Sequence, residues 1–200
     1  MDIKAFIFDM DGLLFDSERI VQRSWEIAGD ELGIPHMGDV IYHTLGMNRA
    51  GRNEYFRKYI REDFPFEEFG KLTRDNFWKI VDKEGLPLKK GAKELLAYGK
   101  SQGYKMAVAT SSSREYAMGN LIRAGIDSYF DSVVCGDMVK KAKPDPEIYQ
   151  KACESLGIQP EYCMAFEDAP GGILSAHQAG MHVIMVPDLV QPTQEIRELT

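Results

Sequence analysis

The chain has 200 residues, of which 44% are hydrophobic and 28% charged, and its formal net charge is −7. A chain of this length buries about 70% of its unfolded surface, so it needs neither disulfides nor a structural metal to fold. The acidic balance and the lack of a basic stripe exclude nucleic acid as a partner, and no apolar run has the roughly 18 residues of a membrane span or the character of a secretory signal. We expect a monomeric, cytoplasmic protein without a membrane partner.

Short apolar runs without polar alternation predict five parallel strands that are covered on both faces of a sheet. Between Phe15 and Leu86 the pattern is helical throughout, and from the third strand onward strands alternate with helices, which is a β-α-β rhythm. The expected strands are residues 4–8, 105–110, 132–135, 163–166 and 182–186; the expected helices are 17–32, 48–60, 66–84, 113–124, 146–156 and 170–179.

These elements predict an α/β fold, in which a parallel-sheet core (residues 1–16 and 87–200) carries an inserted all-helical cap domain (residues 17–86). A glycine followed by an apolar residue is the usual helix stop, and it recurs at Gly33, Gly85, Gly103, Gly125, Gly157 and Gly180. Four aromatic residues lie on helical periods of the insert and are expected in its core: Trp25, Phe56, Tyr59 and Trp78. The three cysteines, Cys135, Cys153 and Cys163, lack a C-x-x-C pair and are expected to be buried thiols.

Polar side chains follow several of the predicted strands at the point where each strand ends. In open α/β sheets ligands bind outside the carboxyl ends of the strands, so these side chains form one candidate site. Four carboxylates in one place would repel, by about 4 kcal/mol for a pair 4 Å apart at an effective dielectric near 20. The candidate site consists of Asp9 and Asp11 after the first strand, Thr110, Ser111 and Ser112 after the second, Glu167 and Asp168 after the fourth, and Lys143 in a loop.

A cation must therefore lie among these carboxylates. Oxygen ligands without His or Cys select a hard ion, and Mg²⁺ is the expected cofactor, with Lys143 as a further positive charge. The Thr110 hydroxyl and the backbone N–H groups of Ser111 and Ser112 suit a phosphate. The Asp-x-Asp spacing allows Asp9 to attack phosphorus, while Asp11 acts as general acid and base.

Four segments, in this order, resemble the four motifs of the haloacid dehalogenase superfamily. The closest likeness is to its β-phosphoglucomutase-like phosphatase branch with a helical cap. The resemblance implies a Rossmannoid core and a Mg²⁺ ion held by the side chains of Asp9 and Asp168, by the backbone carbonyl of Asp11, and by Glu167 as a further candidate. The four segments are residues 9–18 (DMDGLLFDSE), 108–111 (VATS), 143–149 (KPDPEIY) and 166–168 (FED).

In the insert, residues 45–49 (LGMNR) resemble the substrate-specificity loop of that branch, which makes Gly46, Asn48 and Arg49 candidate substrate-binding residues. The same arginine would equally suit an exposed helix surface. The expected function is hydrolysis of small phosphate monoesters, sugar phosphates above all, with a phosphorylated metabolite as partner.

Two alternatives stay open. One is a phosphohexomutase of the β-phosphoglucomutase type, although the resemblance assigns mutases a His at the position of Val21 and a Lys at that of Leu45, and neither is present. The other is a non-catalytic binding protein of the same fold, against which the intact motifs argue. Dehalogenases, which need no second acid, and phosphonatases, which have Ala in place of Asp11, fit the sequence less well.

Overall fold

The computed structural model describes residues 2–44 and 49–200 of the chain; it does not describe the side chains of residues 49 and 50. The chain divides into two compact units, one of Met1–Asp16 with Pro87–Thr200 and one of Ser17–Leu86. We call the first the core and the second the cap. None of the described helices combines the length and the apolar character that a membrane crossing requires.

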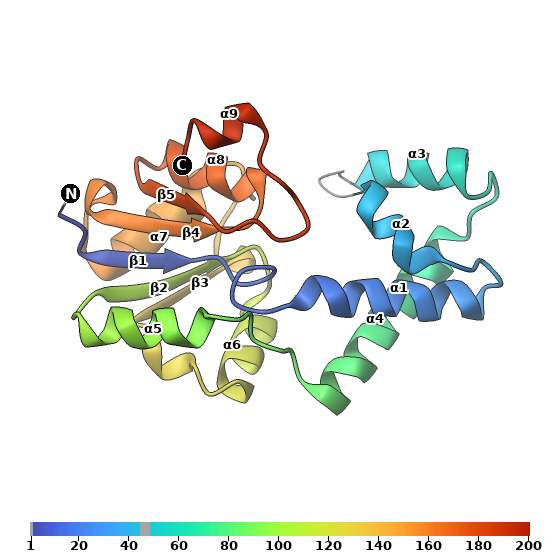
Figure 1. Cartoon of the computed structure of the whole chain (residues 1–200), viewed down its shortest axis with the longest axis horizontal. Helices are drawn as coiled ribbons and strands as arrows, with labels where there is room; N and C mark the ends of the chain where they lie inside the picture. Colours follow the sequence, from blue (N-terminus) through green and yellow to red (C-terminus); the bar gives the residue numbers. More distant parts are fainter. Residues whose placement is uncertain (1, 45–48) are drawn as a thin grey trace. The chain divides into compact units, whose positions relative to one another are not determined.

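The core is built on a parallel sheet of five strands with the order β3-β2-β1-β4-β5 (Figure 1). The first strand in the sequence, β1, therefore lies in the middle, paired with β2 on one side and β4 on the other. The predicted α/β fold with a parallel sheet is confirmed. The strands are β1 (Ala5–Phe8), β2 (Lys105–Thr110), β3 (Ser132–Cys135), β4 (Cys163–Glu167) and β5 (His182–Met185).

Side chains of successive strand residues point to opposite faces of the sheet, and each face has its own cover. Ala5, Ile7 and Ala165 belong to a buried cluster with residues of α7 and α8. On the other face Phe6 lies against Gly99 of α5 and stacks on Tyr104 at 4.2 Å. The helices of the core are α5 (Ala92–Ser101), α6 (Arg114–Arg123), α7 (Glu147–Leu156), α8 (Pro170–Gln178) and α9 (Gln194–Arg197), with short 3₁₀ turns at Asp127–Tyr129, Gly136–Met138 and Pro160–Tyr162.

The expectation that every strand is covered on both faces is wrong at the edge strand β5. The register places Phe8, Phe166 and Ile184 side by side on the α5 face. Phe8 and Phe166 are buried, whereas Ile184 is 38% exposed and Val186, just beyond the strand, is 45% exposed. An edge strand has a neighbour on one side only, so its outer side chains need further elements to cover them.

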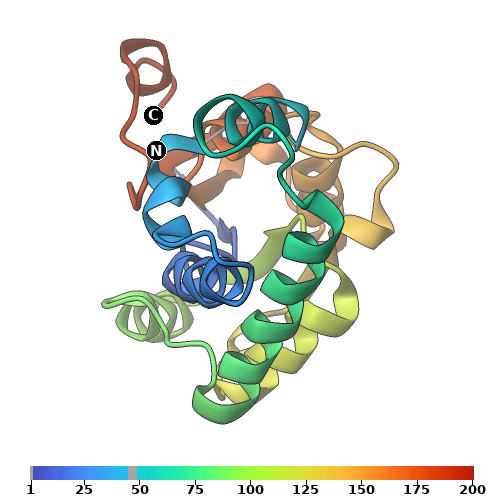
Figure 2. The ribbon, with the colours of Figure 1, turned by 90° about the vertical axis from the view of Figure 1, so that its right-hand side faces the viewer.

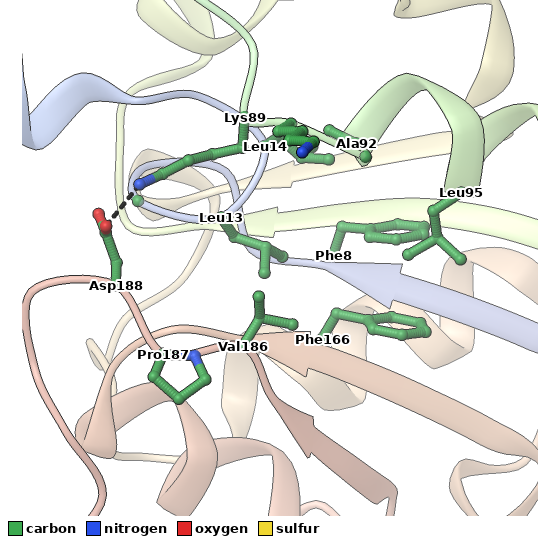
Figure 3. A pocket seen from close by; sticks show the side chains of 13 residues that line it. Phe8, Leu13, Leu14, Lys89, Ala92, Leu95, Phe166, Val186, Pro187 and Asp188 are labelled. Carbon is green, nitrogen blue, oxygen red and sulfur yellow. Dashed lines mark ion pairs between the residues drawn. The ribbon is translucent and has the colours of Figure 1, made fainter.

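A cavity of about 330 Å³ lies next to this apolar row, between the loop after β1, the start of α5 and the segment after β5 (Figure 3). Its walls are mostly apolar. Lys89 lines it and is held by two carboxylates, with its Nζ 2.5 Å from Asp188 and 3.3 Å from Asp16. Through Lys89, the loop after β1 is linked to the segment after β5.

The cap contains four described helices: α1 (Ser17–Glu31), α2 (Met37–Thr44), α3 (Arg49–Tyr59) and α4 (Phe66–Glu84). Figure 2 looks along the axis of α1, which packs against both α2 and α4. Trp25 and Phe56 are buried in the cap core, as predicted, with an edge-to-face contact at 5.6 Å.

Two other aromatic residues of the cap contradict their predicted burial, because Tyr59 is 59% and Trp78 44% exposed. Trp78 lies between the buried Asn76 and Ile80 of α4, and a residue two positions from each points to the opposite side of a helix. Tyr59 is the last residue of α3 and rests on Tyr55, with ring centroids 4.7 Å apart.

Two predictions about smaller features are confirmed. The six glycines expected to stop helices all have a positive φ, between 66° and 85°. The three cysteines are free and buried.

Candidate active site

Lys143 lies at the centre of the candidate site, where it meets the carboxyl ends of three strands. Its Nζ is 2.5 Å from Oδ1 of Asp9, directly after β1, and 2.6 Å from Oε1 of Glu167, the last residue of β4. It also donates a hydrogen bond of 2.9 Å to the carbonyl of Ala109 in β2. All three charged side chains are at most 11% exposed. Two carboxylates and one ammonium are thus held together away from water.

The titration of this group follows from burial and from the shared ammonium. The pKa of Asp9 is raised to about 7: burial raises it most, Lys143 offsets part of this effect, and the neighbouring Glu167 adds to the increase. For Lys143, burial alone lowers the pKa, but the two carboxylates outweigh this effect and the net shift is upward. Lys143 therefore stays positively charged and can balance negative charge that gathers at Asp9.

Glu167 is fixed from several sides. Its Oε1 accepts a hydrogen bond of 2.6 Å from the hydroxyl of Tyr149, and its Oε2 accepts the backbone N–H of Asp168 at 3.2 Å. A Cβ atom at Gly172 would collide with the Glu167 carboxylate, so only glycine leaves room for it. Burial and Glu167 keep the pKa of the Tyr149 phenol well above its usual value, so the phenol remains a neutral donor.

Tyr149 is a residue that the sequence analysis did not identify as part of the site. It lies within the motif segment at residues 143–149, but on an amphipathic helix its position is that of an ordinary core residue. Its side chain is completely buried and belongs to the main core cluster. Its hydroxyl, at one end of that cluster, faces the charged group.

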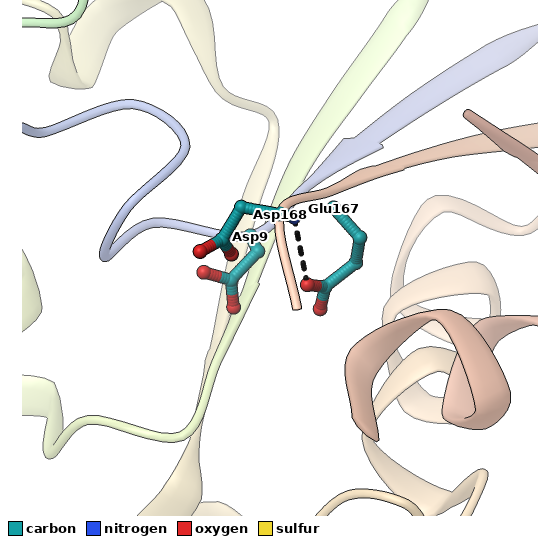
Figure 4. A group of neighbouring side chains, drawn as sticks. All are labelled: Asp9, Glu167 and Asp168. Carbon is teal, nitrogen blue, oxygen red and sulfur yellow. Dashed lines mark hydrogen bonds between the residues drawn. The ribbon is translucent and has the colours of Figure 1, made fainter. Parts of the chain in front are cut away.

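Three carboxylates could hold a metal ion. Ligand atoms of Asp9, Glu167 and Asp168 all lie within 4.8 Å of one another (Figure 4). Gly12 makes room for Asp168: its φ is +85°, and a Cβ atom there would collide with the Asp168 carboxylate. A donor set made only of oxygen atoms fits Mg²⁺.

The second aspartate of the motif, Asp11, points to a different set of partners. Its Oδ2 accepts a hydrogen bond of 2.8 Å from the hydroxyl of Ser112, and its Oδ1 accepts one of 3.0 Å from the hydroxyl of Tyr116 in α6. The sequence did not predict that Tyr116 belongs to the candidate site. Hydroxyl groups thus hold both oxygens of Asp11, a set of partners different from that of Asp9.

The turn after β2 brings the predicted phosphate-binding residues close to Asp11. The Thr110 hydroxyl accepts the backbone N–H of Ser112 at 3.1 Å, and the Thr110 side chain is buried. The carbonyl of Ser111 lies so close to Gly136 that a Cβ atom there would collide with it. Ser113 caps α6 by accepting the N–H of Tyr116 at 3.4 Å. The turn is therefore fixed at the end of β2.

The predicted substrate-binding residues of the insert are not characterised by the structure. Gly46 and Asn48 lie outside the described residues, and so does the side chain of Arg49, the residue at which α3 begins.

Comparison with known proteins identifies the family of this chain. The family model of haloacid dehalogenase-like hydrolases matches residues 6–186. The chain is 34% identical to YhcW of Bacillus subtilis (strain 168), over 96% of this chain and 86% of the relative. It is also 34% identical to the phosphorylated carbohydrates phosphatase of Thermotoga maritima, over 91% and 84%.

A solved structure has the same fold over nearly the whole chain. It is a haloacid dehalogenase family hydrolase from Deinococcus radiodurans R1 with bound phosphate and sodium, which superposes with a TM-score of 0.82 at 25% identity. The match covers 99% of this chain and 88% of that one. The family model, the relatives and this structure agree that the chain belongs to the haloacid dehalogenase-like hydrolase family.

Proposed function

We propose that this chain is a phosphatase that hydrolyses small phosphate monoesters, with sugar phosphates as its substrate class, through a phosphoryl group carried on Asp9. The observation that carries the proposal is the buried Lys143 ammonium, in contact with both Asp9 and Glu167 at the carboxyl edge of the sheet. The relative in Thermotoga maritima, named a phosphorylated carbohydrates phosphatase, supports the substrate class.

In the first step a carboxylate oxygen of Asp9 attacks the phosphorus atom. The bond between phosphorus and the ester oxygen breaks, its electron pair moves to that oxygen, and the carboxyl group of Asp11 gives it a proton. Lys143 neutralises part of the charge of the attacking carboxylate and the phosphoryl group. Its contact with Asp9 at 2.5 Å provides this without rearrangement.

In the second step the Asp11 carboxylate takes a proton from a water molecule. The water oxygen attacks phosphorus, the bond to Asp9 breaks, and inorganic phosphate and the free Asp9 carboxylate result. The hydroxyl groups of Ser112 and Tyr116 hold Asp11 in place between the two steps. Asp9 and Asp11 thus have different roles because they have different partners.

Mg²⁺ belongs in this proposal as the cofactor, and the side chains of Asp9 and Asp168 and the backbone carbonyl of Asp11 would hold it. When bound, it would supply positive charge that lowers the repulsion between a carboxylate and a phosphate dianion. Glu167 is better suited to holding Lys143, since its Oε1 already contacts both Lys143 and Tyr149 at 2.6 Å. Calorimetry with Mg²⁺ tests whether Asp168 holds the metal and Glu167 holds Lys143. Asp168→Ala should abolish Mg²⁺ binding, and Glu167→Gln should weaken it far less.

A screen of phosphorylated sugars and of an aryl phosphate tests the function, with release of inorganic phosphate as the readout. Wild-type protein should release phosphate and Asp9→Asn should not. Transfer of the phosphoryl group to another hydroxyl without phosphate release would identify a mutase. Inactivity of the wild-type protein on every ester would point to a binding protein and would overturn the proposal.

A further inference from the structure

The cap contains a second candidate binding site, a cavity of about 360 Å³. All of its walls belong to the cap, with residues from α1, α3 and α4. Aromatic rings form one part of the lining, namely those of Trp25, Phe56 and Phe66, and two arginines form another, Arg52 and Arg74. The combination of a ring-lined wall and two guanidinium groups is unlike the apolar cavity of the core.

The charge of this cavity is unbalanced. Among the residues that the structure describes, its lining includes Arg52 and Arg74 but no aspartate or glutamate. Among the described residues neither arginine has a carboxylate partner, whereas Arg23 and Arg61 of the same unit are paired with Glu84 and Asp63 at 2.7 and 2.8 Å. In a chain with a net charge of −7, two arginines without a carboxylate partner that line one cavity mark a place for an anion.

The side chains also indicate what kind of anion fits. A guanidinium group binds phosphate or carboxylate through two parallel hydrogen bonds. The Arg52 guanidinium carbon lies 5.9 Å from the centre of the Trp25 ring, and this contact orients the group in the wall of the cavity. The rings of Trp25, Phe56 and Phe66 offer apolar surface for an organic body attached to the anion.

We propose that Arg52 and Arg74 bind an anionic group, phosphate or carboxylate, of a small organic molecule in this cavity. Two sources share that chemistry: a second anionic group of the substrate itself, or a separate anionic metabolite. Assigning the anion to a substrate, or a regulatory effect to the metabolite, rests on the proposed phosphatase function; binding of the anion in the cavity does not.

Binding can be measured without turnover in the Asp9→Asn protein. Fructose 1,6-bisphosphate serves as the probe and Trp25 fluorescence as the readout, with Trp78 replaced by Phe, since these are the two tryptophans of the chain. Arg52→Gln and Arg74→Gln should each weaken binding by about tenfold, the effect of losing one charge-assisted hydrogen bond.

The matched control is Arg61→Gln, because Arg61 is another cap arginine that does not line the cavity. It should leave the affinity unchanged. Equal affinities in the Arg52, Arg74 and Arg61 variants would overturn the proposal. Because Arg52 is half-buried and Arg74 exposed, these variants should fold normally, and their thermal unfolding checks this.

Kinetics of the protein with Asp9 intact distinguish the two sources. If the anion belongs to the substrate, the Arg52 and Arg74 variants should lose about tenfold in kcat/KM on fructose 1,6-bisphosphate and little on an aryl phosphate. If it belongs to a separate metabolite, citrate should change the aryl phosphate rate of the wild-type protein but not of these variants. Absence of any turnover would contradict the phosphatase proposal, while the fluorescence titration would still decide whether the cavity binds anions.

Discussion

Replacing Tyr149 by Phe removes one oxygen atom from the buried group around Lys143 and leaves the packing of the ring intact. The variant loses the hydrogen bond of 2.6 Å that the phenol donates to Oε1 of Glu167 and the longer one, 3.4 Å, that it accepts from Nζ of Lys143. A hydrogen bond to a charged group stabilises a protein by about 1.5–3 kcal/mol. Since Glu167 keeps its contact with Lys143, we expect the lower part of that range, about 1.5–2 kcal/mol.

For a protein of this size, 1 kcal/mol corresponds to about 2–4 °C in the melting temperature, so Tyr149→Phe should lower it by about 3–8 °C. Thermal unfolding followed by circular dichroism measures the shift. Tyr98→Phe is the matched control: Tyr98 is 53% exposed on α5, and its replacement should change stability by less than about 0.5 kcal/mol. If the two variants melt at the same temperature, the phenol does not stabilise Glu167 and our account of the buried group is wrong.

Three further predictions concern the site. Asp9→Asn should abolish phosphate release and leave no phosphoryl group to trap, whereas Asp11→Asn should lose about 10²- to 10⁴-fold in turnover, as expected for general acid–base catalysis; equal losses would refute their separate roles. A chelator should stop phosphate release and added Mg²⁺ should restore it, so full activity after chelation would exclude a metal. Gly12→Ala and Gly125→Ala should both lower the free energy of unfolding by about 1–2 kcal/mol, because both glycines have a positive φ. Only Gly12→Ala should weaken Mg²⁺ binding in calorimetry, because only its Cβ meets Asp168. A similar loss of Mg²⁺ affinity in both variants would show that Gly12 does not act on the metal site.

The sequence predicts best the elements with a strong hydrophobic pattern. Strands β2 (Lys105–Thr110) and β3 (Ser132–Cys135) and helix α4 (Phe66–Glu84) have the predicted bounds. Helix α5 (Ala92–Ser101) was missed because its buried positions are Ala92, Leu96 and Gly99, and two small side chains give little periodic signal. Helix α2 (Met37–Thr44) is short and contains a glycine, which weakens its pattern.

The candidate site shows a similar division. Residues at the ends of parallel strands must lie at one edge of the sheet, and so Asp9, Thr110 and Glu167 could be grouped from the sequence. Tyr149 and Tyr116 could not, because an aromatic residue at a helical period also fits a core position. Tyr116 meets Asp11 across 105 residues of sequence, and only the folded chain shows that its hydroxyl finds a carboxylate.

Because β1 lies in the middle of the sheet, the candidate site at its end depends on strands that come much later in the chain. Asp9 precedes its partner Lys143 by 134 residues, and the strand that carries Glu167 begins only at Cys163. A nascent chain that ends before this strand leaves one side of β1 without a neighbour, and it lacks half of the carboxylates of the site. The arrival of β4 therefore gives β1 its second neighbour and brings Glu167 and Asp168 to the candidate site, so we expect no fragment that stops short of β4 to release phosphate.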